Sequence, residues 1–325
     1  MYFRNLVILS SFVDFFGKIC SSVVESSKYL SITSGDFYLL DSTFINMNSQ
    51  KYATVLVQVS TPGCCLVEQC YFSSCVSTSA GGAVCIQSSN FQSVFHKSCS
   101  YRCYINTNSW IYGQFCHVVN SGSLQNCLYF VSVTQCSPSS ISKGSDPISL
   151  WSGNQTMRNV NVSQNYVSQE SFGIFAQGDT RIEHCNFEKN RAYYIGFYIY
   201  AGNGIMSYSN IINNDSPNGY GVMTEISANV EYVFCVFLDN TDLLFSTTTI
   251  NKVTSCWISH SYGLVGGSSR IETIDIRGYS PPYSMNMFAT RECVAIHPIM
   301  KGLSTINNKH QTKNLMIICF ILLII

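Results

Sequence analysis

The stretch Ile182-Glu-His-Cys185-Asn-Phe187-Glu-Lys-Asn190 has a near copy further along the chain, Tyr232-Val-Phe-Cys235-Val-Phe237-Leu-Asp-Asn240. In both stretches a small residue and a large apolar residue stand two positions apart. Residues two apart in a β-strand point to the same side of the strand. Each stretch therefore predicts a short strand whose small and large side chains both face one interior.

The same small-x-large phrase recurs along most of the chain at intervals of 18 to 33 residues. A drifting period of this size predicts a solenoid. Most repeats also carry a second extended run, commonly led by glycine, and no sustained helical period occurs before the last eleven residues. Short strands and a repeat of about 25 residues predict an all-β fold, a parallel β-helix of about ten coils. The small positions are Ser42, Cys70, Cys99, Cys127, Val160, Cys185, Ser209, Cys235, Cys256 and Ile274.

The composition agrees with stacked coils joined by tight turns. Asn190, Asn214 and Asn240 end three of the phrases, where each coil has to turn a corner. Asn tolerates left-handed backbone and forms local hydrogen bonds. Stacked in successive coils, these residues would form an internal ladder of amides.

The charge pattern excludes some classes of function. Charged residues make up 11% of the chain, against about 25% in an average domain, and the formal net charge is zero. A phosphate backbone is bound by clustered basic residues, which this chain lacks, so no nucleic-acid partner is predicted. No glycine-rich loop precedes a helix, so no nucleotide cofactor is predicted either.

Sixteen cysteines are the second unusual feature of the composition. A free cysteine behaves as a small apolar residue, and thiols about 4.8 Å apart in a parallel ladder do not favour disulfide geometry. Six cysteines hold the small position of the phrase, so we expect them to form a structural ladder: Cys70, Cys99, Cys127, Cys185, Cys235 and Cys256. Other cysteines crowd the first half, where disulfides would fit a secreted protein: Cys64, Cys65, Cys75, Cys85, Cys103, Cys116 and Cys136. Their spacing matches no zinc site, so no metal is predicted.

Both ends of the chain resemble membrane-directed segments, on either side of a β-helix expected over residues 23–300. Residues 1–22 carry an early basic residue before an apolar run, which is typical of a secretory signal. The alternative for this segment is an N-terminal cap of the solenoid. Residues 301–314 form a polar, basic linker, and residues 315–325 are uninterruptedly apolar.

The apolar tail is too short to cross a bilayer, which takes about 20 residues. Three interpretations remain: a truncated transmembrane helix, the removable tail of a lipid-anchor signal, or a segment lying in the membrane interface. A buried final strand is the soluble alternative. We expect a membrane protein whose β-helix lies on the extracellular face, at the cell surface.

Three sequons are consistent with a secretory route. They start at Asn154, Asn161 and Asn214, and each is a formal acceptor for N-glycosylation.

The motifs Phe187-Glu-Lys-Asn190, Phe237-Leu-Asp-Asn240 and Gly81-Gly-Ala-Val84 resemble the FxxN and GGA[ILV] repeats of polymorphic membrane proteins. From Phe37 to Tyr279 the pattern is similar to right-handed, pectin-lyase-like β-helix surface proteins such as those of trichomonads. The resemblance implies a right-handed β-helix ectodomain displayed at a cell surface and involved in adhesion.

The competing function is a polysaccharide lyase or glycoside hydrolase on the same architecture. Sugar hydrolysis needs paired carboxylates, and a lyase needs a calcium cluster with an arginine base. The chain has no Asp-Asp pair, and the nearest fragments are Ser259-His260-Ser261, Arg181-Ile-Glu183 and Arg270-Ile-Glu272. The only acids suited to a cluster are Asp146, Asp179, Asp215, Asp239 and Asp242. We therefore expect no catalytic residue and no cofactor.

A run of aromatic residues offers a binding surface instead. Tyr194, Tyr198 and Tyr200 would form an outward strip if they do not continue the core. Exposed aromatic side chains bind sugar rings or anchor protein partners. The expected function is a non-catalytic adhesion or interaction scaffold with a protein or carbohydrate ligand.

Overall fold

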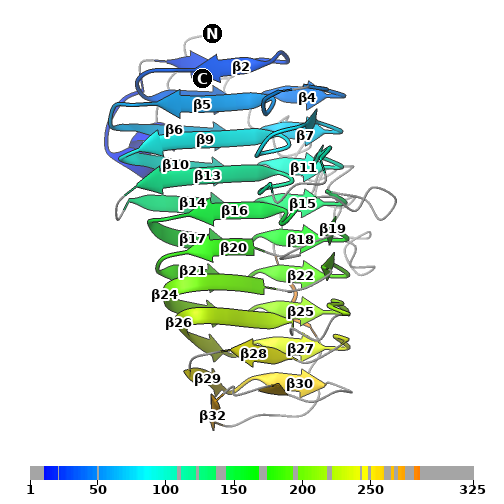
Figure 1. The fold of residues 1–325 in the computed structure, drawn as a ribbon. Helices are drawn as coiled ribbons and strands as arrows, with labels where there is room; N and C mark the ends of the chain where they lie inside the picture. The colour runs from blue at the N-terminus through cyan, green and yellow to red at the C-terminus, as the bar shows by residue number, and fades with distance from the viewer. Residues whose placement is uncertain are drawn as a thin grey trace, which may run out of the picture. The chain divides into compact units, whose positions relative to one another are not determined.

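The computed structural model shows a parallel β-solenoid (Figure 1). It describes residues 11–20, 22–49, 51–107, 111–121, 124–136, 144–167, 174–192, 197–217, 222–241, 244–247, 250–259, 265–266, 270–274 and 282–285. The predicted linker 301–314 and apolar tail 315–325 lie outside these residues. Within the described part, no helix is long and apolar enough to span a membrane.

Three ladders of parallel strands run along the solenoid, and each coil contributes one strand to each ladder in turn. The first ladder consists of β2 (Leu30–Ile32), β5 (Val55–Val59), β9 (Val84–Ser89), β13 (Cys116–Ser121), β16 (Ile148–Trp151), β20 (Ile174–Gln177), β24 (Phe197–Ser207), β26 (Met223–Val233), β28 (Phe245–Thr247) and β31 (Val265–Gly266).

The second ladder follows the first across a bend. It consists of β1 (Val23–Val24), β3 (Phe37–Leu40), β6 (Gly63–Glu68), β10 (Phe91–His96), β14 (Gln125–Tyr129), β17 (Asn154–Arg158), β21 (Thr180–Glu183), the second halves of β24 and β26, β29 (Ile250–Thr254) and β32 (Arg270–Ile274). Because β24 and β26 run unbroken through both ladders, the two form a single 19-stranded sheet.

The third ladder is a separate sheet of nine three-residue strands. These are β4 (Thr43–Ile45), β7 (Tyr71–Ser73), β11 (Cys99–Tyr101), β15 (Ser132–Thr134), β18 (Asn161–Ser163), β22 (Asn186–Glu188), β25 (Asn210–Ile212), β27 (Val236–Leu238) and β30 (Trp257–Ser259). Beyond it lie two short pairs, β8 (Val76–Ser77) with β12 (Tyr104–Ile105) and β19 (Tyr166–Val167) with β23 (Arg191–Ala192).

Most of the repeat phrases lie in the third ladder, and the two exceptions are the phrases that begin at Cys127 and at Ile274. The tenth phrase begins at Ile274, which instead closes β32 in the second ladder, opposite Thr254. The stretch Val131–Val133 supplies the strand that was expected at Cys127, so nine strands stack in the third ladder where ten phrases were counted.

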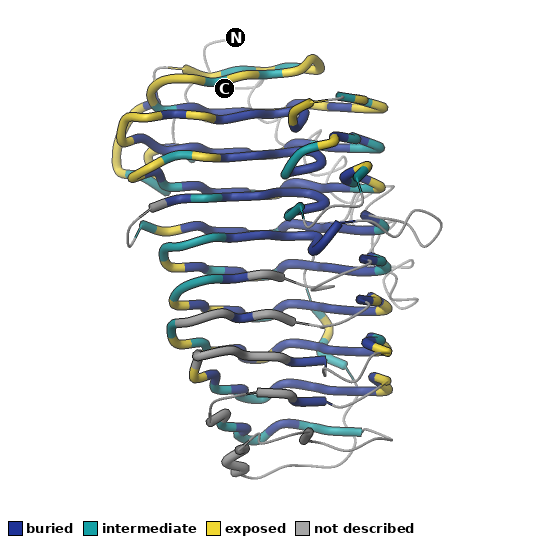
Figure 2. Tube along the Cα trace, in the orientation of Figure 1, coloured by how far each residue is buried: buried dark blue, intermediate teal, exposed yellow. Residues whose placement is uncertain are grey.

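Buried residues recur in successive coils along the solenoid (Figure 2). Their apolar side chains form one large core cluster. Phe44 and Phe72 lie one coil apart and stack with ring centroids 5.1 Å apart. Phe187 and Phe237, the aromatic residues of the two FxxN motifs, are fully buried. The inward direction predicted from the period of two is confirmed at these positions.

The GGA motif occupies a crowded point between two coils. Gly81 has a φ of 73°, and a Cβ on Gly82 would lie 2.1 Å from the carbonyl oxygen of Gln114. Only glycine permits both the left-handed backbone and this close approach. The motif is thus explained by backbone packing.

Candidate ligand-binding groove

Two corners flank each strand of the third ladder, and both are built from left-handed residues. The first corner precedes the strand and the second corner follows it. At the second corner one residue per coil has a φ between 51° and 56°: Asn46, Ser74, Arg102, Gln135, Gln164, Lys189, Asn213 and Asp239. Left-handed backbone costs a non-glycine residue roughly 1–2 kcal/mol, so this repeated choice needs a compensating interaction.

The predicted asparagine ladder supplies that interaction. Asn165, Asn190, Asn214 and Asn240 immediately follow the left-handed residues and are at most 1% exposed. Asn214 Oδ1 accepts hydrogen bonds from the backbone N–H and the Nδ2 of Asn190, both at 3.0 Å. Asn214 Nδ2 donates to Phe187 O at 2.9 Å and to Asn240 Oδ1 at 3.1 Å. Every amide hydrogen-bonding group of Asn214 is used, which fixes this corner in each coil.

Cysteines take the same inner position in the earlier coils. Cys75, Cys103 and Cys136 each follow a left-handed residue and are 0% exposed. Cys136 N–H donates to Asn165 Oδ1 at 2.8 Å, so the thiols lead directly into the amide ladder. Burial raises the pKa of the Cys103 thiol, which keeps this sulfur protonated.

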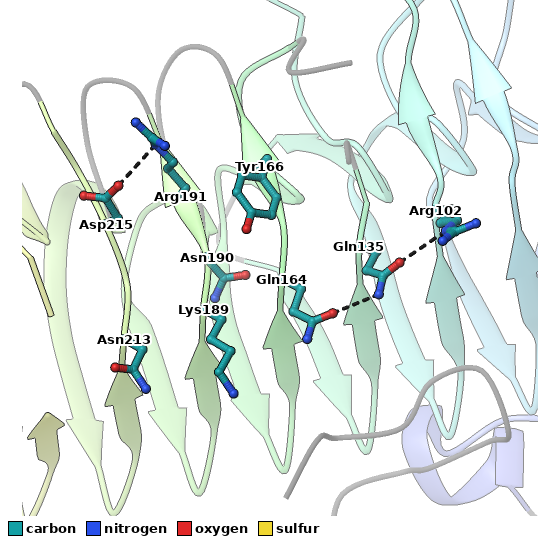
Figure 3. Close-up of a pocket in the computed structure, with 9 residues that line it drawn as sticks. All are labelled: Arg102, Gln135, Gln164, Tyr166, Lys189, Asn190, Arg191, Asn213 and Asp215. Carbon is teal, nitrogen blue, oxygen red and sulfur yellow. Dashed lines mark hydrogen bonds and ion pairs between the residues drawn. The ribbon is translucent and has the colours of Figure 1, made fainter. Parts of the chain in front are cut away.

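On the outer side of the second corner, the left-handed residues line a groove of about 550 Å³ that runs across several coils (Figure 3). Arg102 Nε donates to Gln135 Oε1 at 3.2 Å, and Gln135 Nε2 donates to Gln164 Oε1 at 2.8 Å. The groove thus contains an outer row of three hydrogen-bonded side chains from successive coils, Arg102, Gln135 and Gln164. Its lining is Arg102, Gln135, Gln164, Tyr166, Lys189, Asn190, Arg191, Asn213 and Asp215.

The charges of the groove are largely balanced. Arg191 Nε lies 3.2 Å from Asp215 Oδ2, and Lys189 Nζ lies 2.7 Å from Glu188 Oε1. The Arg102 guanidinium lies over the Tyr101 ring, 5.0 Å from its centroid. The groove therefore presents donors and acceptors together, with a small excess of positive charge.

The six predicted ladder cysteines do not all share one position. Cys70, Cys185, Cys235 and Cys256 do, and they directly precede β7, β22, β27 and β30 of the third ladder. Backbone hydrogen bonds define this column. The carbonyl oxygen of each column residue accepts the backbone N–H of a residue at the start of the next coil's third-ladder strand. The residues whose carbonyls do so are Ser42, Cys70, Ser98, Val131, Val160, Cys185, Ser209 and Cys235. The small, inward character of the position is maintained throughout, because all members are at most 1% exposed.

Cys99 and Cys127 were assigned to the wrong position. Ser98, not Cys99, occupies the column, and Cys99 follows one residue later in a disulfide bond, not as a free thiol of the ladder. The inward partner is Ser100, and the Phe115 ring packs against Phe72 and Phe95 at this level of the core. Because the Phe115 ring fills the core at this level, the inward position of β11 can be occupied by the small Ser100.

Cys127 lies in the second ladder instead. It faces Val94 of the preceding coil with its side chain on the outer surface of the sheet, and Val131 holds the column position. This coil contains two small-x-large phrases, Cys127–Tyr129 and Val131–Val133, and their spacing to the neighbouring phrases does not show which one lies in the third ladder.

The three sequons lie in very different surroundings. Asn154 is exposed at the start of β17. Asn161 is fully buried, where its Oδ1 accepts from Asn186 Nδ2 at 3.0 Å, and Asn214 belongs to the inner ladder. A glycan has no room on either buried amide, so the prediction for Asn161 and Asn214 is inconsistent with the fold, and Asn154 stays a prediction.

The acids considered for catalysis are dispersed. Asp146 is buried and accepts from Gly113 N–H at 3.2 Å, Asp179 accepts from Asn203 N–H at 2.8 Å, and Asp215 alone lies in the groove. Asp242 and His260 lie outside the described residues. Within those residues, no three His, Cys, Asp or Glu side chains gather as a metal site would require.

Of the predicted tyrosine strip, Tyr194 and the side chains of Tyr198 and Tyr200 lie outside the described residues. A different aromatic row occurs at the first corner. His184, Tyr208 and Phe234 stack in successive coils with centroids 5.3 and 5.2 Å apart. All three are left-handed, with φ of 51°, 49° and 53°. The rings cover one another's faces, so this row stabilises the corner and leaves mainly ring edges to solvent.

Comparisons with known proteins show no relative of this chain. No family model matches the chain. Neither the curated proteins nor the solved structures contain a match.

Proposed function

We propose that this chain is a non-catalytic, cell-surface β-solenoid that binds an extended carbohydrate in its second-corner groove and acts in adhesion. The observation that carries the proposal is the outer row Arg102–Gln135–Gln164, which presents hydrogen-bonding groups once per coil. Successive coils are about 4.8 Å apart. A polymer lying along the solenoid would thus meet the same kind of contact repeatedly.

The chemistry of the groove favours a hydroxyl-rich ligand. A sugar hydroxyl both donates and accepts, and so do the amides of Gln135, Gln164 and Asn213. The ring of Tyr166 supplies an aromatic surface beside them, as Figure 3 shows. Balanced ion pairs orient Lys189 and Arg191 without creating a strongly basic surface.

A polysaccharide-active enzyme is less well supported by the same groove. Hydrolysis requires one carboxyl group as acid and a second as base or nucleophile. Among the described residues, Asp215 is the only carboxylate that lines the groove, and it is engaged by Arg191 and by the Thr241 hydroxyl. This arrangement suits a binding surface better than a catalytic pair.

Display at a membrane, a right-handed coil and kinship with polymorphic-membrane-protein repeats remain part of the proposal. The FxxN motif has a clear structural role here, because Phe187 enters the core and Asn190 enters the inner ladder. Crossovers between parallel strands are right-handed in nearly all proteins. The apolar tail at 315–325 supports membrane attachment.

The proposal is tested by applying the full chain to an array of immobilised glycans. We expect saturable binding to extended glycans, and loss of about tenfold or more in affinity for the double variant Gln135→Ala/Gln164→Ala, since each lost hydrogen bond costs roughly 1 kcal/mol. Asp239→Ala is the matched control, because Asp239 holds the same corner position beyond the groove. Equal binding by the double variant would refute the groove as the site, and product release from a glycan would favour the enzyme.

A further inference from the structure

The outer face of the second ladder changes character along the solenoid. In β3, β6, β10 and β14 the outward side chains form two columns, one of Tyr38, Leu66, Val94 and Cys127 and the other of Leu40, Glu68, His96 and Tyr129. The first of these columns is at most 5% exposed. In the next coils the same columns continue with Thr156, Arg181 and Ile205 and with Arg158, Glu183 and Ser207. Ile205 there is 38% exposed.

A short helical segment lies against the apolar part of this face. Residues 11–16 form the helical turn, and the Phe12 ring is fully buried with its centroid 5.8 Å from that of Tyr38. Phe15 stacks on Tyr129, with centroids 5.9 Å apart and planes at 8°, and meets the edge of His96 at 5.3 Å. The two rings therefore reach from the strand of Tyr38 to the strand of Tyr129.

Polar contacts hold the same segment in place. Lys18 Nζ lies 2.8 Å from Asp36 Oδ1, and the same oxygen accepts the backbone N–H of Cys64 at 2.9 Å. Beneath the segment, Glu68 is 3% exposed and bonds to the Tyr38 hydroxyl and to His96 Nδ1, the latter at 2.7 Å. A buried carboxylate is costly unless it is well partnered, so this site is adapted to being covered.

The geometry points to a built-in acceptor surface on β3, β6, β10 and β14 for a short aromatic helical segment, with residues 11–20 of this chain as its occupant. The position of the segment carries the inference, because the column of Tyr38, Leu66, Val94 and Cys127 is largely apolar and buried under it. Beyond the segment the same column continues with Thr156 and Arg181. The inference does not depend on the groove.

Thiol labelling of the full native chain tests this directly, because Cys64 and Cys127 lie under the segment at 7% and 3% exposure. We expect slow labelling of both in the unaltered chain. In Phe12→Ala/Phe15→Ala, their labelling by a small alkylating reagent should accelerate roughly tenfold or more, because local opening becomes easier. Cys185 and Cys235, inside the solenoid, should stay unlabelled in both proteins. Ile19→Ala is the control, since Ile19 is 70% exposed.

Three outcomes would overturn the inference. One is equally fast labelling of Cys64 and Cys127 in the unaltered chain and the double variant. Another is labelling in the double variant that slows as protein concentration rises, which would assign the face to a second copy. Labelling of Cys185 in the double variant would mean that the solenoid itself has opened, and the single variant Phe15→Ala is then measured instead. The third outcome is a labelling rate of Cys127 in Phe15→Ala that equals the rate in the unaltered chain.

Discussion

Asn190 donates both its backbone N–H and its side-chain amide to one oxygen, Asn214 Oδ1, at 3.0 Å each. The same pairing joins Asn165 to Asn190 and Asn214 to Asn240. Each coil thus fixes the corner of its neighbour through groups that water cannot reach. The stability of the later coils should depend on these amides more than on any single apolar contact.

Replacing Asn214 by alanine should destabilise the chain by roughly 2–4 kcal/mol, because it leaves the buried N–H of Asn190 without an acceptor. Urea unfolding followed by circular dichroism measures the change. Asn213→Ala is the control, since Asn213 is the exposed neighbour at the same corner, and it should cost much less. Equal losses in both variants would contradict a special role for the inner ladder.

The column position of Cys185 should accept serine but not a large residue. Val160 and Ser209 hold this position in the adjacent coils, and burial raises the pKa of Cys185 to about 12. We expect Cys185→Ser to lose about 1 kcal/mol, and Cys185→Phe to lose more, because extra volume in a packed core costs typically 1–3 kcal/mol or above. Thermal unfolding of the two variants gives the comparison. Better stability of the phenylalanine variant would disprove the size limit.

His117 should make the chain sensitive to mild acid. Its side chain is 6% exposed, and burial lowers its pKa from 6.5 to about 4. The unfolded chain therefore takes up a proton at a higher pH than the folded chain does. The stability contributed by neutral His117 is complete above pH 6.5 and is lost as the pH falls through 4, by roughly 3 kcal/mol in all.

The measurement is the free energy of unfolding from pH 7.5 to 4 for the unaltered chain and for His117→Gln. The variant should show a flatter profile over this interval. Ile19→Ala, at an exposed position that does not titrate, serves as the comparison and should keep the original slope. An unchanged slope in His117→Gln would rule out His117 as the titrating group.

Two glycines with the same backbone angle separate strain from crowding. Gly35 and Gly81 both have a φ of 73°, but a Cβ on Gly35 would meet nothing within 4 Å, whereas one on Gly81 would lie 2.2 Å from Val84 O. Gly35→Ala should cost roughly 1–2 kcal/mol, the penalty of left-handed backbone alone. Gly81→Ala should cost clearly more. Similar losses on urea unfolding would mean that the coil relaxes around the added methyl group.

The sequence predicted the parallel β-solenoid well, because inward positions recur with a period of two inside each coil. It failed where two frames fit the same coil, as at Ser98 and Cys99, since only the packing of Phe115 distinguishes them. The left-handed backbone at Phe234 could not be predicted from local propensities either, because its ring stacks on Tyr208 of the preceding coil, and this contact offsets an unfavourable backbone conformation.

The groove could not be predicted from the sequence for a related reason. Gln135 and Gln164 stand 29 residues apart in the chain, and neither belongs to a recognisable motif. They become neighbours because the next residues, Cys136 and Asn165, are buried side by side in successive coils. A search for residues that directly precede the inner asparagines and cysteines would have found most of the row.

The inner amides also bear on how such a chain can change in length. Neighbouring members are 24 to 26 residues apart, and each makes the same bonds to the one before and the one after. Excising one whole unit between two of them would leave ends that can rejoin without a mismatch. Recombination within the gene could therefore lengthen or shorten the protein in whole coils, and vary the number of ligand contacts, without inventing a new fold.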